Sequence, residues 1–177
     1  QLGLACEPLW LNQVHGVEVF ALQEDESPAV PPTADAAMTR TVGQALTVMT
    51  ADCLPVLFCD RAGSVIATAH AGWRSLCYGV LENTLLSMQV APADVLVWMG
   101  PAIGPDAFEV GEEVRQAFMQ QDPAAVLAFK PSGQDGKWLA DLWLLARQRL
   151  NALGVTAIYG GGLCTYSDAE RFYSYRR

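Results

Sequence analysis

Three residues of this sequence have side chains suited to metal binding or to nucleophilic chemistry: His15, Cys53 and His70. Cys53 and His70 lie in two apolar, strand-like runs that are separated by a turn-like break at residues 60–63. If the two runs pair as a hairpin, the thiol and the imidazole lie at about the same level. The chain has only two histidines, and the other, His15, precedes Gly16 in a predicted bend. We therefore predict that the fold brings these three side chains together.

One thiol and two imidazoles are compatible with several kinds of site. Zinc accepts thiolate and imidazole, and a catalytic zinc site has three protein ligands and an open position where bound water has a pKa of about 7. Copper accepts the same ligands. Without a metal, Cys53 is a candidate nucleophile and His70 its base. A core cysteine beside two incidental histidines is a further interpretation, and the residues alone leave these alternatives open.

Charged residues close to these motifs also have alternative interpretations. Asp52 is placed to orient a ligand imidazole or to cap a turn. Arg74 is placed to bind an anion or to pair with an acid at the start of a helix. Arg176 and Arg177 end the chain, and their planar guanidinium groups suit a phosphate, although such pairs are more often solvated charge.

The composition predicts one globular domain. The chain has 177 residues, of which 51% are hydrophobic and 17% charged, which is enough for a substantial core. Its net charge of −8 disfavours a nucleic-acid-binding protein, because such proteins need basic surface for the phosphate backbone. No apolar run approaches the length of about 18 residues that indicates a membrane span.

The cysteines and the amino-terminal residues bear on localisation. The five cysteines are widely spaced and odd in number, which disfavours a disulfide framework. No charged segment followed by an apolar one suggests a secretory signal. We therefore expect free thiols in a cytoplasmic protein. The first residue is Gln1 rather than methionine, so we expect the native start to lie upstream.

Hydrophobic periodicity predicts the elements that position these residues. We expect two short strands within residues 8–22, a strand at 34–38, the hairpin at 48–73, and buried strands at 95–99 and 155–159. Helical patterns cover residues 74–90, the segment after Glu112, and residues 139–153, with a polar loop at 130–137. Strands and helices alternate irregularly around a hairpin, which favours the α+β class over a doubly wound sheet.

Five ordered motifs span nearly the whole chain and carry a family resemblance. They are LNQVHG at residues 11–16, TADCLPV at 50–56, AHAGWR at 69–74, GPAIGPDAFEVG at 100–111, and CTY with FYSYRR within residues 164–177. With these motifs the sequence resembles the bacterial laccase-domain family, also called YfiH-like or polyphenol oxidase-like.

The resemblance implies a fold and a ligand set. The expected fold is a four-layer α/β/β/α sandwich with mixed sheets, of the type shared with cysteine hydrolases and deamidases of bacterial toxins. The expected site binds zinc, or alternatively copper, through His15, Cys53 and His70. Residues 1–177 would form a single laccase-type domain, and family chains usually extend beyond both ends of it.

The resemblance also implies an activity. Family members are described as purine nucleoside phosphorylases that act on adenosine, inosine or methylthioadenosine with phosphate, and as adenosine deaminases. Arg74, Arg176 and Arg177 are then candidates for substrate binding. The alternatives are a copper-dependent polyphenol oxidase, a metal-free cysteine–histidine hydrolase and a non-catalytic binding module. Two histidines are too few for the copper centres of a true multicopper oxidase.

Overall fold

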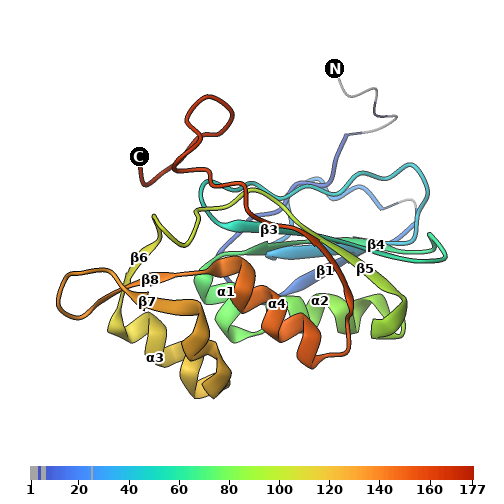
Figure 1. The fold of residues 1–177 in the computed structure, drawn as a ribbon. Helices are drawn as coiled ribbons and strands as arrows, with labels where there is room; N and C mark the ends of the chain where they lie inside the picture. Colours follow the sequence, from blue (N-terminus) through green and yellow to red (C-terminus); the bar gives the residue numbers. More distant parts are fainter. Residues whose placement is uncertain (1–3, 5–6, 25) are drawn as a thin grey trace.

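A six-stranded mixed sheet forms the centre of the computed structural model, which describes residues 4, 7–24 and 26–177 (Figure 1). The strand order is β1-β2-β4-β3-β5-β9. The β1–β2 and β5–β9 pairs are parallel, and the other neighbours are antiparallel. The strands are β1 (Val19–Leu22), β2 (Ala36–Thr39), β3 (Leu54–Asp60), β4 (Ile66–Ala71), β5 (Val95–Met99) and β9 (Ala157–Gly160).

A second, antiparallel sheet of three short strands lies beside the first. It has the order β6-β8-β7, with β6 (Glu109–Gly111), β7 (Phe129–Pro131) and β8 (Lys137–Ala140). The sequence predicted a polar loop over residues 130–137 and a helix from residue 139. Instead, both ends of the predicted loop belong to strands, and residues 139 and 140 belong to β8 rather than to a helix. These strands are short, and Lys130 and Pro131 are exposed, so the sequence has too little alternation of apolar and polar residues to indicate a strand.

The described residues also form four α-helices and two short 3₁₀ helices. They are α1 (Trp73–Tyr78), α2 (Val80–Met88), α3 (Glu112–Gln121), α4 (Leu142–Ala152), η1 (Pro92–Asp94) and η2 (Pro123–Ala128). The continuous helix predicted for residues 74–90 is instead two helices. Gly79 separates them with a φ of 105°, a conformation that residues with a Cβ atom rarely adopt.

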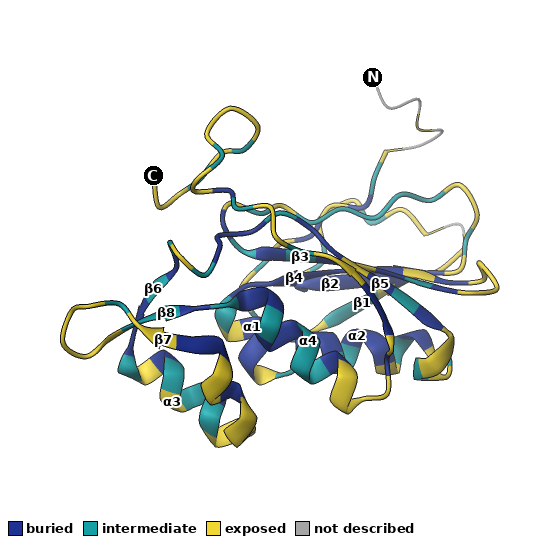
Figure 2. Cartoon of the chain, in the orientation of Figure 1, coloured by how far each residue is buried: buried dark blue, intermediate teal, exposed yellow. Residues whose placement is uncertain are grey.

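The main core lies between the six-stranded sheet and the helices on one of its faces (Figures 1 and 2). The burial of β3 alternates, so that Leu54, Val56 and Phe58 point into this core while Leu57 points away from it. Helices α1 and α2 pack against the sheet, and α4 packs beside them. This packing fixes the β3–β4 hairpin, which carries two of the candidate residues.

The opposite face of the sheet is covered over β1 and β2 by a smaller core cluster, but it is apolar and open to solvent over β3, β4, β5 and β9. Leu57, Ile66, Trp98 and Tyr159 are 39–58% exposed there, and a hollow of about 550 Å³ lies over the sheet beside them. The fold is therefore α+β with mixed sheets, as the sequence predicts, with its helices gathered on one side of the larger sheet.

Two observations on the described residues bear on membrane and disulfide expectations. No helix in this part of the chain has the length and hydrophobicity to cross a bilayer. Cys53, Cys59, Cys77 and Cys164 are all free thiols, and Cys6 lies outside the described residues.

We expect a thiol titration of the denatured, unreduced protein to find all five cysteines of the sequence. The reason is that the four described cysteines have no disulfide partner. The control is the same titration after reduction, which should give an equal count. A count that rises by two on reduction would show a disulfide and contradict the expectation.

Candidate metal centre

The β3–β4 hairpin places the thiol and one imidazole at neighbouring positions. Cys53 lies immediately before β3, where Leu54 pairs with Ala71, and His70 pairs with Pro55. The prediction that Cys53 and His70 lie at about the same level is therefore confirmed. His70 is buried, with 3% of its surface exposed, whereas Cys53 is half-buried.

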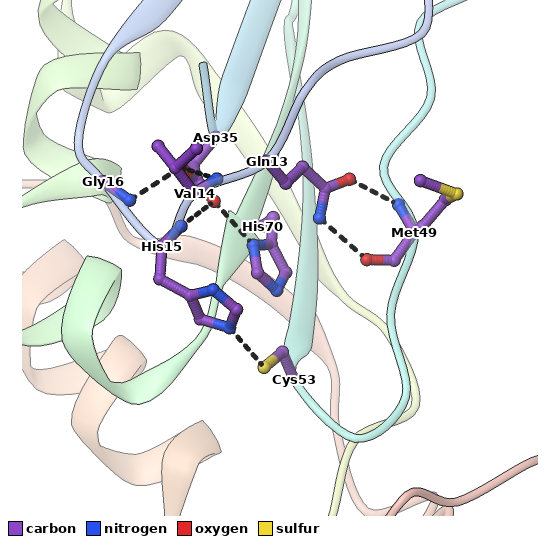
Figure 3. Close-up of polar contacts among 8 residues, drawn as sticks. All are labelled: Gln13, Val14, His15, Gly16, Asp35, Met49, Cys53 and His70. Carbon is purple, nitrogen blue, oxygen red and sulfur yellow. Dashed lines mark hydrogen bonds and ion pairs between the residues drawn. The ribbon is translucent and has the colours of Figure 1, made fainter. Parts of the chain in front are cut away.

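His15 reaches the hairpin from a turn that precedes β1. The two strands predicted for residues 8–22 are one strand, β1, preceded by isolated bridges at Leu9 and Asn12. His15 itself has a φ of 58°, in the left-handed region that non-glycine residues rarely adopt. The Gln13 side chain forms two hydrogen bonds of 2.9 and 2.8 Å with the backbone of Met49, which joins this turn to the segment that leads to Cys53 (Figure 3).

The three side chains converge on one point. Their ligand atoms all lie within 4.8 Å of one another. The Cys53 sulfur is 3.8 Å from Nε2 of His15, and the rings of His15 and His70 meet edge to face with centroids 4.8 Å apart. Tetrahedral bonds to zinc of about 2.0 Å from nitrogen and 2.3 Å from sulfur require separations of about 3.3–3.6 Å between ligand atoms. The group therefore fits a metal ion after small side-chain adjustments.

A buried carboxylate, that of Asp35, borders the site on its inner side (Figure 3). Its Oδ1 atom lies 2.8 Å from Nδ1 of His70 and accepts the backbone N–H of His15 at 3.0 Å. Its Oδ2 atom accepts the backbone N–H groups of Val14 and Gly16 at 3.1 and 2.6 Å. The sequence analysis did not single out Asp35. The signal that could have identified it is a single carboxylate inside an apolar, strand-like run, because a buried carboxylate needs hydrogen-bond partners.

Burial and hydrogen bonding set the protonation of this cluster. Burial works to raise the pKa of Asp35, but the hydrogen bonds from His70, Gly16 and Val14 together lower it, so that the carboxylate is ionised. Burial lowers the pKa of His70 despite the opposing hydrogen bond to Asp35, so that the imidazole is neutral at pH 7. A neutral imidazole is the form that binds metals.

The thiol of Cys53 is also affected by burial, which favours its protonated form. Burial raises its pKa to about 11, and the charges of Asp52 and Asp35 contribute to the increase. At pH 7 the sulfur is therefore a protonated thiol, which is a poor nucleophile. A metal cation would compensate the buried negative charge and displace the proton.

A cavity of about 420 Å³ opens beside the three side chains. His15 and Cys53 form part of its wall. Its other walls are largely apolar and aromatic, with Trp73, Phe108 and Tyr175 among the lining residues. Small-molecule sites commonly have this size and this mixture of aromatic walls with a few polar groups.

The three candidate arginines occupy different places. Arg176 lines the cavity, where its guanidinium lies 5.5 Å from the ring of Phe108 and donates to the carbonyl oxygen of Glu109. Arg74 is exposed and lies over the ring of Trp73, at 4.4 Å. The guanidinium of Arg177 donates to three backbone carbonyl groups, those of residues 165, 166 and 172.

Asp52 forms hydrogen bonds with residues near the end of the chain. This buried carboxylate accepts the hydroxyl of Thr165 at 2.7 Å and the backbone N–H of Arg176 at 3.1 Å. Of the two roles considered for Asp52, orienting an imidazole is therefore wrong for this structure, and Asp35 contacts the imidazole instead. The two bonds hold Thr165 and the backbone of Arg176 beside Asp52, which itself lines the cavity.

The link between β4 and α1 leaves no room for a side chain. A Cβ atom added to Gly72 would lie 2.8 Å from the His15 ring and 3.0 Å from the Cys53 sulfur. The backbone of Gly72 has φ −59° and ψ 157°, which alanine adopts readily, so Gly72→Ala acts through this contact alone. We expect the substitution to lower zinc affinity by roughly 10-fold or more, the scale seen when the groups that orient ligands are disturbed. Titration of the variant against a competing chelator measures this.

Gly111→Ala provides a matched control for that prediction. The atoms nearest to a Cβ atom there belong to the carboxylate end of the exposed Glu113 side chain, which can move away, and φ is −82°. We expect this variant to bind zinc as the unmodified protein does. Equal zinc affinity in the Gly72 and Gly111 variants would show that the three side chains do not bind the metal in this geometry.

Comparisons with solved structures identify the fold. A crystal structure of a Neisseria meningitidis protein matches with a TM-score of 0.91 at 49% identity, over 96% of this chain and 69% of that one. The crystal structure of YlmD from Geobacillus stearothermophilus matches with a TM-score of 0.88 at 28% identity, over 94% of this chain and 67% of that one. The fold is therefore that of these longer proteins.

Sequence comparisons give the family. A protein of Pseudomonas aeruginosa named as a purine nucleoside phosphorylase is 56% identical over 98% of this chain and 70% of its own length. The purine nucleoside phosphorylase YfiH of Escherichia coli is 54% identical over 99% of this chain and 70% of its own length. The family model described as multi-copper polyphenol oxidoreductase laccase matches residues 1–177. The chain therefore belongs to this laccase-like, YfiH-type family.

Proposed function

We propose that this chain is the core of a zinc-dependent purine nucleoside phosphorylase that acts on adenosine, inosine or methylthioadenosine. The observation that carries the proposal is the convergence of His15, Cys53 and His70, two of which, His15 and Cys53, line the 420 Å³ cavity. The names of the relatives from Pseudomonas aeruginosa and Escherichia coli support the same reaction. The high pKa of Cys53 supports a metal over a free thiolate nucleophile.

The reaction requires a phosphate, a nucleoside and a way to stabilise the leaving base. A phosphate oxygen attacks C1′ of the ribose, the bond from C1′ to the base nitrogen breaks, and the base leaves with the bonding electrons and takes up a proton. The products are the free base and ribose 1-phosphate. A zinc ion, when bound, supplies a fixed positive charge that polarises an oxygen or nitrogen of the substrate.

The residues of the chain contribute binding and orientation. Trp73, Phe108 and Tyr175 offer aromatic walls against which a purine ring can stack. Arg176 offers a guanidinium for phosphate beside them. The buried Asp52 holds the backbone of Arg176 and so fixes the position of this wall relative to Cys53.

Adenosine deamination is a second proposed activity of the same site. The cavity lies beside His15 and Cys53, and a polarising metal held there would serve hydrolysis at a ring carbon of a purine as well as transfer to phosphate. Copper is an alternative metal, because it accepts the same ligands. Copper-dependent phenol oxidation and a metal-free hydrolase are the competing proposals.

Base release from a panel of purine nucleosides tests the proposal. The zinc-loaded protein should release hypoxanthine from inosine when phosphate is present and little without it. Deamination of adenosine should appear as inosine in phosphate-free buffer. Efficient oxygen uptake with a phenol, without any base release, would support the oxidase. Activity that survives a chelator but not a thiol reagent would support the hydrolase.

We expect Arg176→Ala to raise the KM for phosphate by about 10-fold or more, because a hydrogen bond to a charged group contributes about 1.5–3 kcal/mol. The backbone N–H of residue 176, which Asp52 accepts, is kept in this variant. Phosphate saturation curves at fixed inosine measure the effect. Arg74→Ala is the comparison, because Arg74 lies over the ring of Trp73 and is not one of the residues that line the cavity. A larger effect on phosphate in the Arg74 variant would assign phosphate to Arg74 instead.

We infer three further properties. A cytoplasmic location fits the free cysteines. A single domain over residues 1–177 fits the main core cluster, which joins side chains of both sheets. A four-layer sandwich fits the open apolar face of the larger sheet, where a second sheet of the longer family chains would pack.

A further inference from the structure

The carboxylate of Asp35 contacts both histidines of the candidate centre: the ring of His70 and the backbone N–H of His15. The residue has no exposed surface, and it lies directly before β2, between the turn that carries His15 and the strand β4 that carries His70. Its backbone is held on both sides, since its N–H donates to the carbonyl of Glu18 and its carbonyl accepts the N–H of His70 at 2.7 Å. The position of the carboxylate is therefore set by the sheet itself.

The contact with His70 determines which ring nitrogen faces the site. An ionised carboxylate only accepts hydrogen bonds, so Nδ1 of His70 must carry the proton that Asp35 accepts at 2.8 Å. In a neutral imidazole the other nitrogen, Nε2, then has a free lone pair. The contact both selects the tautomer and fixes the rotation of the ring.

The contacts with the turn determine where His15 lies. Asp35 accepts three successive backbone N–H groups, those of Val14, His15 and Gly16. These bonds compensate the unfavourable left-handed backbone of His15, where φ is 58°. The residue is exposed overall, so the turn, together with the edge contact to the His70 ring, aims its imidazole at Cys53.

We propose that Asp35 is the positioning residue of this centre: one buried carboxylate fixes the tautomer of His70 and the backbone turn of His15, and so sets the geometry of both imidazole ligands. The inference rests on the proposed metal site but not on the substrate or the reaction. Outer-shell partners of metal ligands commonly have an effect of 10–100-fold on metal affinity.

Asp35→Asn tests this role, because an amide cannot satisfy the four donors that meet the carboxylate. If the NH₂ group takes the place of Oδ2, it faces the N–H groups of Val14 and Gly16 and the turn opens. If it takes the place of Oδ1, it favours an unprotonated Nδ1 on His70. The proton then moves to Nε2, where it blocks a metal.

The experiment measures zinc affinity by competition with a chelator, together with the ¹⁵N chemical shifts of the His70 ring. We expect Asp35→Asn to lower zinc affinity by about 10–100-fold and to raise the fraction of His70 with its proton on Nε2. The control is Asp60→Asn at the far end of β3. The Asp60 carboxylate is also buried and also holds a turn, through Ser64 and Val65, but it contacts no candidate ligand. We expect the control variant to keep zinc affinity within about twofold of the unmodified protein, well inside the range of an outer-shell effect.

The ring shifts of the unmodified protein test the inference even if Asp35→Asn does not fold. The proposal requires the proton of neutral His70 on Nδ1, and a proton on Nε2 would overturn it. Equal zinc affinities of the Asp35→Asn and Asp60→Asn proteins would overturn it as well. An unmodified protein that binds no zinc would instead refute the metal site on which the inference rests. None of these measurements uses nucleoside turnover, so a failure of the proposed reaction is distinguished from a failure of this inference.

Discussion

Replacement of Cys53 by alanine should abolish stoichiometric zinc binding and lower kcat/KM for inosine phosphorolysis by at least ~100-fold, because it removes a metal ligand rather than a peripheral contact. Cys53 is the only sulfur in the group of three ligand atoms, and it also forms part of the cavity wall. The two imidazoles that remain would hold zinc weakly, since a stable site needs at least three protein ligands. Elemental analysis of protein purified without added metal measures the first effect, and steady-state kinetics the second.

Cys59→Ala is the matched control for this prediction. Cys59 lies in β3, the strand that follows Cys53 directly, but it lines the hollow on the opposite face of the sheet. The substitution removes the same thiol group without touching the centre. A Cys53→Ala protein that retains one zinc per chain and full activity would contradict the ligand assignment.

Replacement of His70 by alanine should have two separate effects. We expect a loss in kcat/KM of at least ~100-fold, for the same reason as at Cys53. We also expect the zinc-free protein to lose about 1–3 kcal/mol of unfolding free energy, because the fully buried Asp35 loses a hydrogen-bond donor. Urea denaturation in the presence of a chelator measures this second effect.

His15→Ala distinguishes the two effects. The His15 side chain is exposed, and its link to Asp35 runs through the backbone N–H, which alanine retains. We expect this variant to lose activity as the His70 variant does, while its zinc-free stability changes by less than about 1 kcal/mol, as is usual for an exposed side chain. Equal losses of stability in both variants would contradict the role assigned to the bond between Asp35 and His70.

The sequence was sufficient to predict the parts of the centre that depend on local pairing. The break at residues 60–63 predicted the hairpin, and the hairpin register then placed Cys53 near His70. The convergence of His15 on the same point was a hypothesis from the scarcity of histidines, because no local spacing relates residue 15 to residue 53. The strand β5 was predicted with the bounds that the structure shows.

The missed features depend on contacts between distant segments. Asp35 and His70 are far apart in the chain and become neighbours only through the antiparallel pairing of β2 with β4. The break at Gly79 interrupts an otherwise regular apolar pattern, so periodicity alone predicted one helix where there are two. The position of Arg176 in the cavity wall depends on the hydrogen bond from its backbone N–H to Asp52, and no sequence pattern predicts this bond.

The central claim is that a metal held by His15, Cys53 and His70 supports transfer of a ribosyl group to phosphate. The most direct test is ³¹P NMR of the zinc-loaded protein incubated with inosine and inorganic phosphate. The account predicts a new resonance of ribose 1-phosphate that grows in step with free hypoxanthine and is absent with the Cys53→Ala protein. Hypoxanthine without ribose 1-phosphate, or no product from inosine, adenosine or methylthioadenosine, would contradict it.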